Sequence, residues 1–126
     1  MKLKSQEEIK EAIEKSCAQD HTQGILAARD VMELLAGKWK IQIIATLSFD
    51  GKKRFMDLLR HVDGIGSKML SKELQNLESH QLITRTVCNT KPITVMYEIT
   101  EYGQSLNGLI IEMINWGIEH RKKIMS

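Results

Sequence analysis

The sequence predicts an α+β fold that is mainly helical and carries one β-hairpin. Apolar residues recur at helical spacing through most of the 126 residues. The pattern changes to alternation over residues 93–100, after a segment rich in β-branched residues at 82–88. One proline and eight glycines are too few for a loop-rich all-β fold, so long regular elements are expected.

Two helices are expected at the N-terminal end of the chain. Residues 5–15 have an apolar stripe, and Ser5 with Glu8 three residues later has the form of a capping box. A polar connection is expected over 17–23. A second helical pattern covers 25–36 and ends before a glycine.

Three further helices are expected in the middle of the chain, forming a trihelical core. They cover residues 39–47, 55–61 and 67–80, with a turn at 49–52. Ser67 is the candidate cap of the third helix. The apolar stripe of that third helix consists of Met69, Leu70, Leu74 and Leu77.

The period then changes from helical to alternating. Residues 82–88 and 93–100 predict two strands, joined by the turn-type loop 89–92. Thr100 is placed to cap a long final helix that runs to about residue 123. The segment 87–95 is therefore expected to be the tip of a hairpin that directly follows the third core helix.

A helix, a tight turn, a second helix and a hairpin in this order predict a winged helix-turn-helix. In this arrangement the second helix is the one over residues 67–80. Its outer face carries short polar and basic side chains suited to base edges and phosphates: Ser67, Lys68, Ser71, Lys72, Gln75 and Asn76. An ordinary amphipathic surface helix would also have a polar face. The hairpin that follows, tipped by Lys91, favours the DNA-binding interpretation.

The charge distribution agrees with a polyanionic partner. Residues 37–92 contain ten Lys and Arg against five Asp and Glu, whereas the whole chain has a net charge of only +2. Lys52, Lys53 and Arg54 form a basic run before the first helix of the pair. Phosphate contact is one interpretation of this run, and a solubilising turn is the other.

The final helix has more apolar residues than one domain can cover. Leu106, Leu109, Ile110, Met113 and Trp116 form one stripe, and Ile111, Ile114 and Ile118 form a second. A second stripe needs another surface, and a symmetric partner is the usual source. The predicted dimer interface comprises Leu109, Met113, Ile114 and Trp116, with Ile9 and Ile13 of the first helix. The alternative is a final helix that is buried in the core of its own domain.

The sequence contains no recognisable catalytic motif, so no enzymatic activity and no cofactor are expected. Cys17 and His21 could be two metal ligands, but zinc needs three or four, so no metal site is expected. No apolar run is long enough to cross a bilayer, and the charged N-terminus lacks a signal-peptide core. A cytoplasmic protein without membrane contact and with reduced cysteines is therefore expected.

Several of these segments together resemble the HxlR-type winged-helix regulators, which are relatives of the MarR-type regulators. The resemblance covers about residues 17–120 of a single domain, with residues 1–16 as an N-terminal helical extension. The residues that carry it are Gly37-Lys38-Trp39, Arg54-Phe55-Met56-Asp57-Leu58, Gly64-Ile65, Lys68-Met69-Leu70, Leu74, Leu77, Leu82-Ile83, Arg85, Pro92, Val95, Tyr97, Thr100, Gly103 and Trp116-Gly117.

The chain departs from the family pattern at three places. Gly66-Ser67 stands where the family often has Ser-Pro, and Met96 stands where it often has Glu. Cys17 is followed by Ala18, not by the usual proline. The first two departures concern helix capping and operator preference, and the third concerns the thiol.

The resemblance implies a dimeric DNA-binding regulator of a bacterial kind. We expect a repressor that binds an inverted-repeat operator in double-stranded DNA as a homodimer and responds to a small-molecule or oxidant inducer. One alternative is a winged-helix module that binds another protein and no DNA. The other is the same regulator gated by oxidation of Cys17, where Lys15 and His21 favour the reactive thiolate, Asp20 opposes it, and Cys88 is a second thiol.

Overall fold

The computed structural model of this chain describes residues 5–17 and 21–126, and the backbone alone for residues 13–17 and 21. The chain divides into two compact units, Met1–Ala36 and Gly37–Ser126.

The first unit contains two helices that pack against each other, α1 (Gln6–Cys17) and α2 (His21–Leu34). The Glu8 amide donates a hydrogen bond to Ser5 Oγ at 3.2 Å, as expected for a capping box. The predicted polar connection over 17–23 was wrong at both ends, because α1 includes Cys17 and α2 begins at His21. Polar residues at the end of a helix do not interrupt it, and only apolar periodicity had marked the boundaries.

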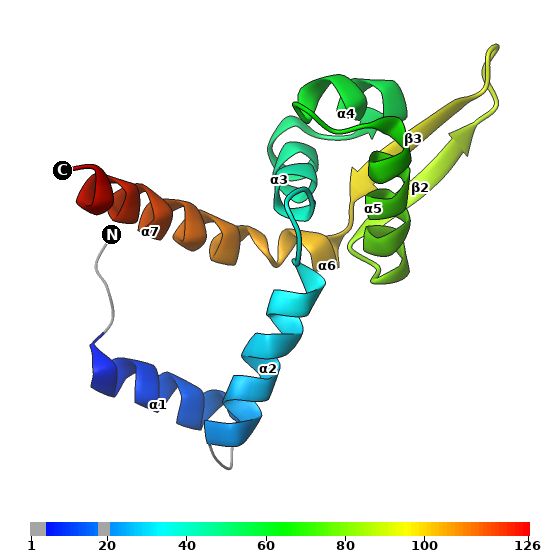
Figure 1. The fold of residues 1–126 in the computed structure, drawn as a ribbon. Helices are drawn as coiled ribbons and strands as arrows, with labels where there is room; N and C mark the ends of the chain where they lie inside the picture. Colours follow the sequence, from blue (N-terminus) through cyan, green and yellow to red (C-terminus); the bar gives the residue numbers. More distant parts are fainter. Residues whose placement is uncertain (1–4, 18–20) are drawn as a thin grey trace. The chain divides into compact units, whose positions relative to one another are not determined.

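The second unit contains five helices and a small sheet (Figure 1). The predicted trihelical core consists of α3 (Lys40–Asp50), α4 (Phe55–His61) and α5 (Ser67–Ser79). Its centre is fully apolar. The completely buried side chains include Ile43, Ile44, Leu47, Leu58, Leu70, Leu74 and Leu77, together with Leu82, Ile83 and Ile110 from outside the three helices.

The sheet has three antiparallel strands, one more than the sequence predicted. They are β1 (Lys53–Arg54), β2 (Ile83–Cys88) and β3 (Thr94–Ile99), in the order β1-β3-β2. The hairpin of β2 and β3 pairs over six residues each, from Ile83 with Ile99 to Cys88 with Thr94. β1 was missed because two residues are too short to show a period.

Two boundaries and one burial assignment in the helical core differ from the prediction. The turn expected at 49–52 begins only after Asp50, where α3 ends. Ser67 is the first residue of α5 and not its cap, because Gly66 occupies the cap position. Met69, which was expected in the apolar stripe, is exposed, whereas Glu73 is buried on the inner face of the helix.

The single final helix predicted from residue 100 is two helices, α6 (Glu101–Gln104) and α7 (Asn107–Met125). Thr100 is the expected cap, and its Oγ1 accepts a hydrogen bond from the Gly103 amide at 2.9 Å. Gly103 lies so close to β3 that a Cβ there would meet Ile99 Cδ1 at 2.7 Å. This tight packing fixes α6 against the sheet before α7 starts in its own direction.

Candidate nucleic-acid interface

Helix α5 presents a polar face on a firmly anchored helix. Its buried side carries Leu70, Leu74 and Leu77, which hold it to the core. All six residues predicted to face DNA lie exposed on its other side: Ser67, Lys68, Ser71, Lys72, Gln75 and Asn76. At 100° per residue these positions cover the outer half of the helix, so one surface can offer hydroxyl, amide and ammonium groups together.

An ion pair that the sequence did not reveal joins α5 to α3. Lys40 Nζ lies 2.9 Å from Glu73 Oε2, and both side chains are about nine-tenths buried, with exposures of 12% and 10%. The apolar pattern placed Lys40 off the buried face of its helix and gave no role to Glu73. A buried ion pair of this kind constrains the packing of α5 against α3.

The three residues of the basic run before α4 lie in different surroundings. Lys52 is exposed, whereas Lys53 is half-buried in β1 and lies opposite Tyr97 of β3. Arg54 Nε donates to Asp57 Oδ2 at 3.3 Å across the first turn of α4. Slight desolvation would raise the pKa of Asp57, but the hydrogen bond and positive charge of Arg54 outweigh it and lower that pKa.

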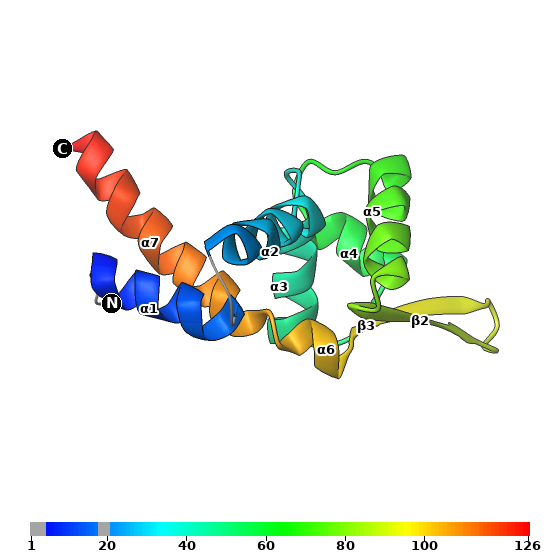
Figure 2. The ribbon, with the colours of Figure 1, turned by 90° about the horizontal axis from the view of Figure 1, so that it is seen from below.

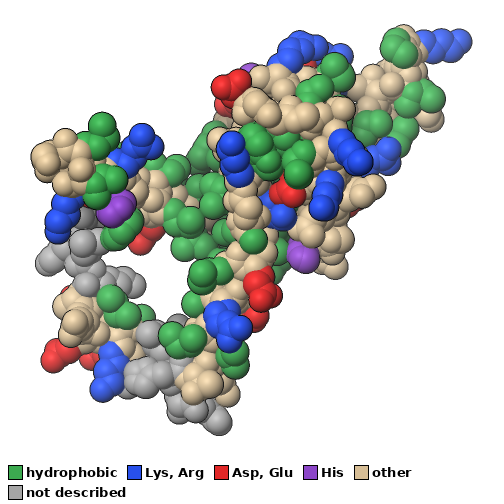
Figure 3. Space-filling model, viewed as in Figure 1, with side chains coloured by type: hydrophobic (Ala, Val, Ile, Leu, Met, Phe, Trp, Pro, Cys, Tyr) green, Lys and Arg blue, Asp and Glu red, His purple; other side chains and the backbone are tan. Residues whose placement is uncertain are grey.

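The hairpin projects beyond the helices, with α5 standing against its base in both views (Figures 1 and 2). Lys91 lies exposed in its loop. Side chains within the loop order it, since Thr90 Oγ1 donates to the Pro92 carbonyl at 2.8 Å. The Oγ1 atoms of Thr90 and Thr94 are also within hydrogen-bond distance, at 3.0 Å. Lys and Arg side chains gather over α5, and a basic side chain lies at the far end of the hairpin (Figure 3).

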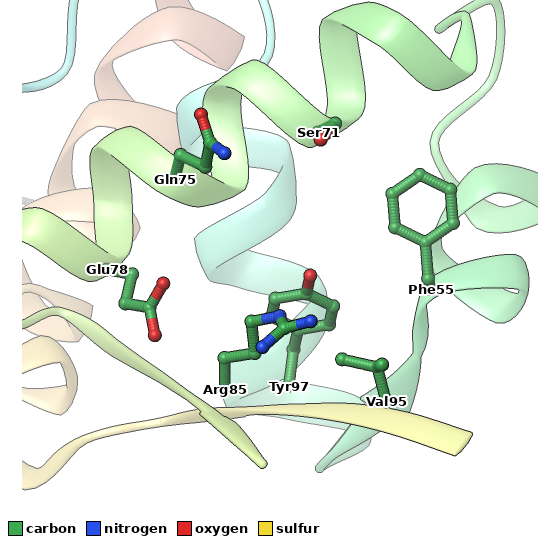
Figure 4. A pocket seen from close by; sticks show the side chains of 7 residues that line it. All are labelled: Phe55, Ser71, Gln75, Glu78, Arg85, Val95 and Tyr97. Atoms are coloured by element: carbon green, nitrogen blue, oxygen red, sulfur yellow. The ribbon is translucent and has the colours of Figure 1, made fainter. Parts of the chain in front are cut away.

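A cleft of 470 Å³ lies between α5 and the hairpin (Figure 4). Helix α5 supplies one wall, the strands supply the other, and the side chains that line it are Phe55, Ser71, Gln75, Glu78, Arg85, Val95 and Tyr97. Sequence reasoning named only Ser71 and Gln75 among them as site residues. The alternation of β2 could have indicated Arg85, because it shares a face with buried Ile83.

The side chains predicted for dimerisation are exposed where the structure describes them. On α7, Leu109, Met113, Ile114 and Trp116 are 41–53% exposed, and on α1 Ile9 is 47% exposed. The side chains of Ile13 and Cys17 lie outside the described residues. Of the first apolar stripe, Ile110 is buried and Leu106 is half-buried, whereas the other three side chains are exposed.

The part of the chain that the structure describes offers little else for chemistry. No three His, Cys, Asp or Glu side chains gather there in a way that could hold a metal ion. None of the helices described is long and apolar enough to span a membrane. Cys88 is a free thiol, half-buried at the end of β2.

Comparison with known proteins agrees with this geometry. The profile of the HxlR-like helix-turn-helix family matches residues 34–125. The chain is 37% identical over 99 residues to YtcD, an HTH-type transcriptional regulator of Bacillus subtilis (strain 168), covering 79% of this chain and 78% of YtcD. It is also 36% identical over 83 residues to the B. subtilis (strain 168) regulator YodB, covering 66% and 73% of the two chains.

Solved structures show the same fold. The crystal structure of YtcD superposes with a TM-score of 0.70 at 39% identity, over 75% of this chain and 96% of the other. The reduced form of the redox regulator HypR superposes with a TM-score of 0.73 at 31% identity, over 79% and 98% of the two chains.

Proposed function

Because this chain belongs to the HxlR-like helix-turn-helix family and is a transcriptional regulator of the HTH type, we propose that it represses transcription as a homodimer on an inverted-repeat operator. The observation that carries the proposal is the outer face of α5. Six polar or basic side chains are exposed on a helix whose other side is locked into an apolar core, next to a projecting hairpin tipped by Lys91.

Each part of this surface has its own task on B-DNA. The major groove accepts one α-helix, so α5 enters it and places the Gln75 and Asn76 amides against base edges. Lys68 and Lys72 flank the same face and are free to reach phosphates. Lys91 extends to the neighbouring backbone. Two such surfaces related by a twofold axis read two half-sites about one helical turn apart.

The first prediction separates phosphate contacts from base reading. The operator is first selected from random DNA, and binding is then measured on the operator and on an unrelated duplex over a range of salt. Lys91→Ala should weaken binding to both duplexes alike and flatten the salt slope by about 0.9. Gln75→Ala should change the ranking of operator variants, by about 1–3 kcal/mol at one base pair.

Two outcomes contradict the assignment. If Lys91→Ala and Gln75→Ala both change only the overall affinity, the reading face lies elsewhere. If the wild-type protein binds no duplex at low salt, the chain is a protein-binding winged-helix module and the proposal fails. Glu112→Gln on exposed α7 is the control for a charge change outside the DNA-facing surface.

A second candidate is the same regulator gated by thiol oxidation. It is supported by the likeness to HypR, whose structure bears the description of a redox regulator, and to YodB, solved in reduced and diamide-treated forms. Cys17 ends α1, and Cys88 is a free thiol on the hairpin. A covalent change at either place would alter a segment that we assign to dimerisation or to DNA contact.

The second prediction tests this gate directly. Operator binding is measured before and after diamide in wild type, Cys17→Ser and Cys88→Ser. Gating by Cys17 predicts at least a several-fold change in wild type and in Cys88→Ser, and none in Cys17→Ser. The same response in all three proteins, or none in any, removes Cys17 from the mechanism.

A further inference from the structure

The cleft between α5 and the hairpin contains two opposite charges that the proposed reading face does not use. Arg85 stands on β2, and Glu78 stands on the last turn of α5. Figure 4 shows both side chains directed into the space between the helix and the strands. Phe55 and Val95 form the apolar end of the same cleft.

Arg85 is exposed and has no partner among the residues that the structure describes. Its guanidinium makes no ion pair and no hydrogen bond with any residue that the structure describes, and Glu78 is not within 4.0 Å of it. The register sets Arg85 opposite Tyr97, and Tyr97 opposite Lys53 on its other side. Directly paired residues share a sheet face, so two cations flank Tyr97 on the side that faces α5.

The position of the cleft determines what can fill it on DNA. If α5 lies in the major groove and the hairpin reaches the adjacent minor groove, the sugar–phosphate backbone between the two grooves must cross the space between helix and hairpin. A guanidinium is suited to phosphate because its planar donors match two oxygens at once. The cleft is open and lined by both polar and apolar side chains, which fits the phosphates and sugars of a backbone better than an enclosed ligand.

We propose that this cleft seats one stretch of DNA backbone, with Arg85 contacting a phosphate and Glu78 opposing it. This inference rests on the proposed DNA binding and adds a regulating element to the same site. Arg85 contributes affinity for any duplex, whereas Glu78 reduces it. Because repulsion of the backbone is the same on every sequence, Glu78 lowers both affinities by the same factor, and the ratio between them is determined by the base contacts of Gln75 and Asn76.

The test uses Arg85→Gln and Glu78→Gln in the full chain, on the selected operator and on an unrelated duplex across a salt series. Arg85→Gln should weaken both complexes about tenfold, as expected for one charge-assisted hydrogen bond, and flatten the salt slope by about 0.9. Glu78→Gln should strengthen both complexes by about threefold, the scale of one exposed charge interaction. The ratio of operator to unrelated affinity should stay the same in both variants, because contacts to the backbone carry no sequence information.

Two controls match these changes outside the cleft. Glu98→Gln removes the same charge from β3, on the sheet face away from Tyr97, and Arg121→Gln removes a guanidinium from α7. Neither should reproduce the effect of its partner variant. Circular dichroism and melting temperature establish that all four variants fold.

Three outcomes overturn the inference and leave the proposed function standing. Arg85→Gln could bind like wild type, in which case the backbone does not cross the cleft. Glu78→Gln could bind more weakly, in which case Glu78 positions Arg85 and does not oppose the DNA. Glu98→Gln could match Glu78→Gln, in which case only net charge matters. Failure of the wild type to bind any duplex overturns the proposed function itself.

Discussion

At the scale of single residues, the contact between Arg54 and Asp57 makes the stability of the fold at the start of α4 depend on pH. Arg54 Nε lies 3.3 Å from Asp57 Oδ2, and Arg60 Nη1 approaches Asp57 Oδ1 at 3.9 Å. Asp57 also stands in the first turn of α4, where a negative charge is favoured by the helix dipole. Together these contacts outweigh the slight desolvation and keep the pKa of Asp57 below its usual range.

The third prediction follows from the sign of this shift. A carboxyl whose pKa is lower in the folded state stabilises the fold above its unfolded pKa, and that contribution is lost as pH falls through the folded value. Asp57→Asn should therefore lower the melting temperature slightly at pH 7. The difference from wild type should shrink below about pH 4. Exposed Asp63→Asn is the control, and an equal pH dependence in both variants would contradict the assignment.

At the scale of elements, the Lys40–Glu73 pair determines how α5 is held on α3. Removing one partner leaves a buried charge without compensation, whereas removing both leaves an apolar contact. The sequence could not show this pair. Helical periodicity finds apolar faces, and a Lys on one helix and a Glu on another become neighbours only when the two helices pack.

The fourth prediction is a difference between single and double replacement. Lys40→Met should destabilise the protein by about 2–4 kcal/mol, below the full range for a buried pair because both side chains keep some exposure to water. The double variant with Glu73→Met should recover most of that loss. Urea unfolding measures both. A single variant as stable as wild type would mean that the pair contributes nothing.

The elements themselves were predictable where their apolar period was long. Helices α3, α4 and α5 and the hairpin of β2 and β3 were expected from spacing alone, and each was found within a few residues. The third strand β1 and the break between α6 and α7 were not expected. Both lie where tertiary contacts are made: β1 pairs with β3, and Gly103 near the end of α6 packs against Leu82, just before β2, and against Ile99 of β3.

At the scale of the whole molecule, the candidate site was predicted in part. The six residues on the outer face of α5 were found exposed, because one helix period determines one face. The cleft was missed, because Glu78 and Arg85 face each other across it only after the hairpin folds back beside α5. Counting charged residues in the sequence also treats Arg54 and Lys40 as free cations. In the structure Arg54 pairs with Asp57, and Lys40 pairs with Glu73.

The last prediction concerns assembly through α7. Eight large apolar side chains are exposed along this helix: Leu109, Ile111, Met113, Ile114, Trp116, Ile118, Ile124 and Met125. At 100° per residue those between 109 and 118, with buried Ile110, occupy more than half of the helix circumference. A solvated helix has no reason to be apolar over such an arc, and a stable dimer must bury about 1,200–2,000 Å² in total.

We therefore expect Ile114→Glu to give a monomer by sedimentation velocity, because a carboxylate in an apolar interface has no partner. Its affinity for the inverted repeat should fall to that for a single half-site, since the two α5 helices no longer bind together. Phe49→Glu is the matched control, because Phe49 is an exposed apolar residue at the end of α3, at 58%. If Ile114→Glu remains dimeric, or if Phe49→Glu dissociates equally, the dimer interface does not lie on α7.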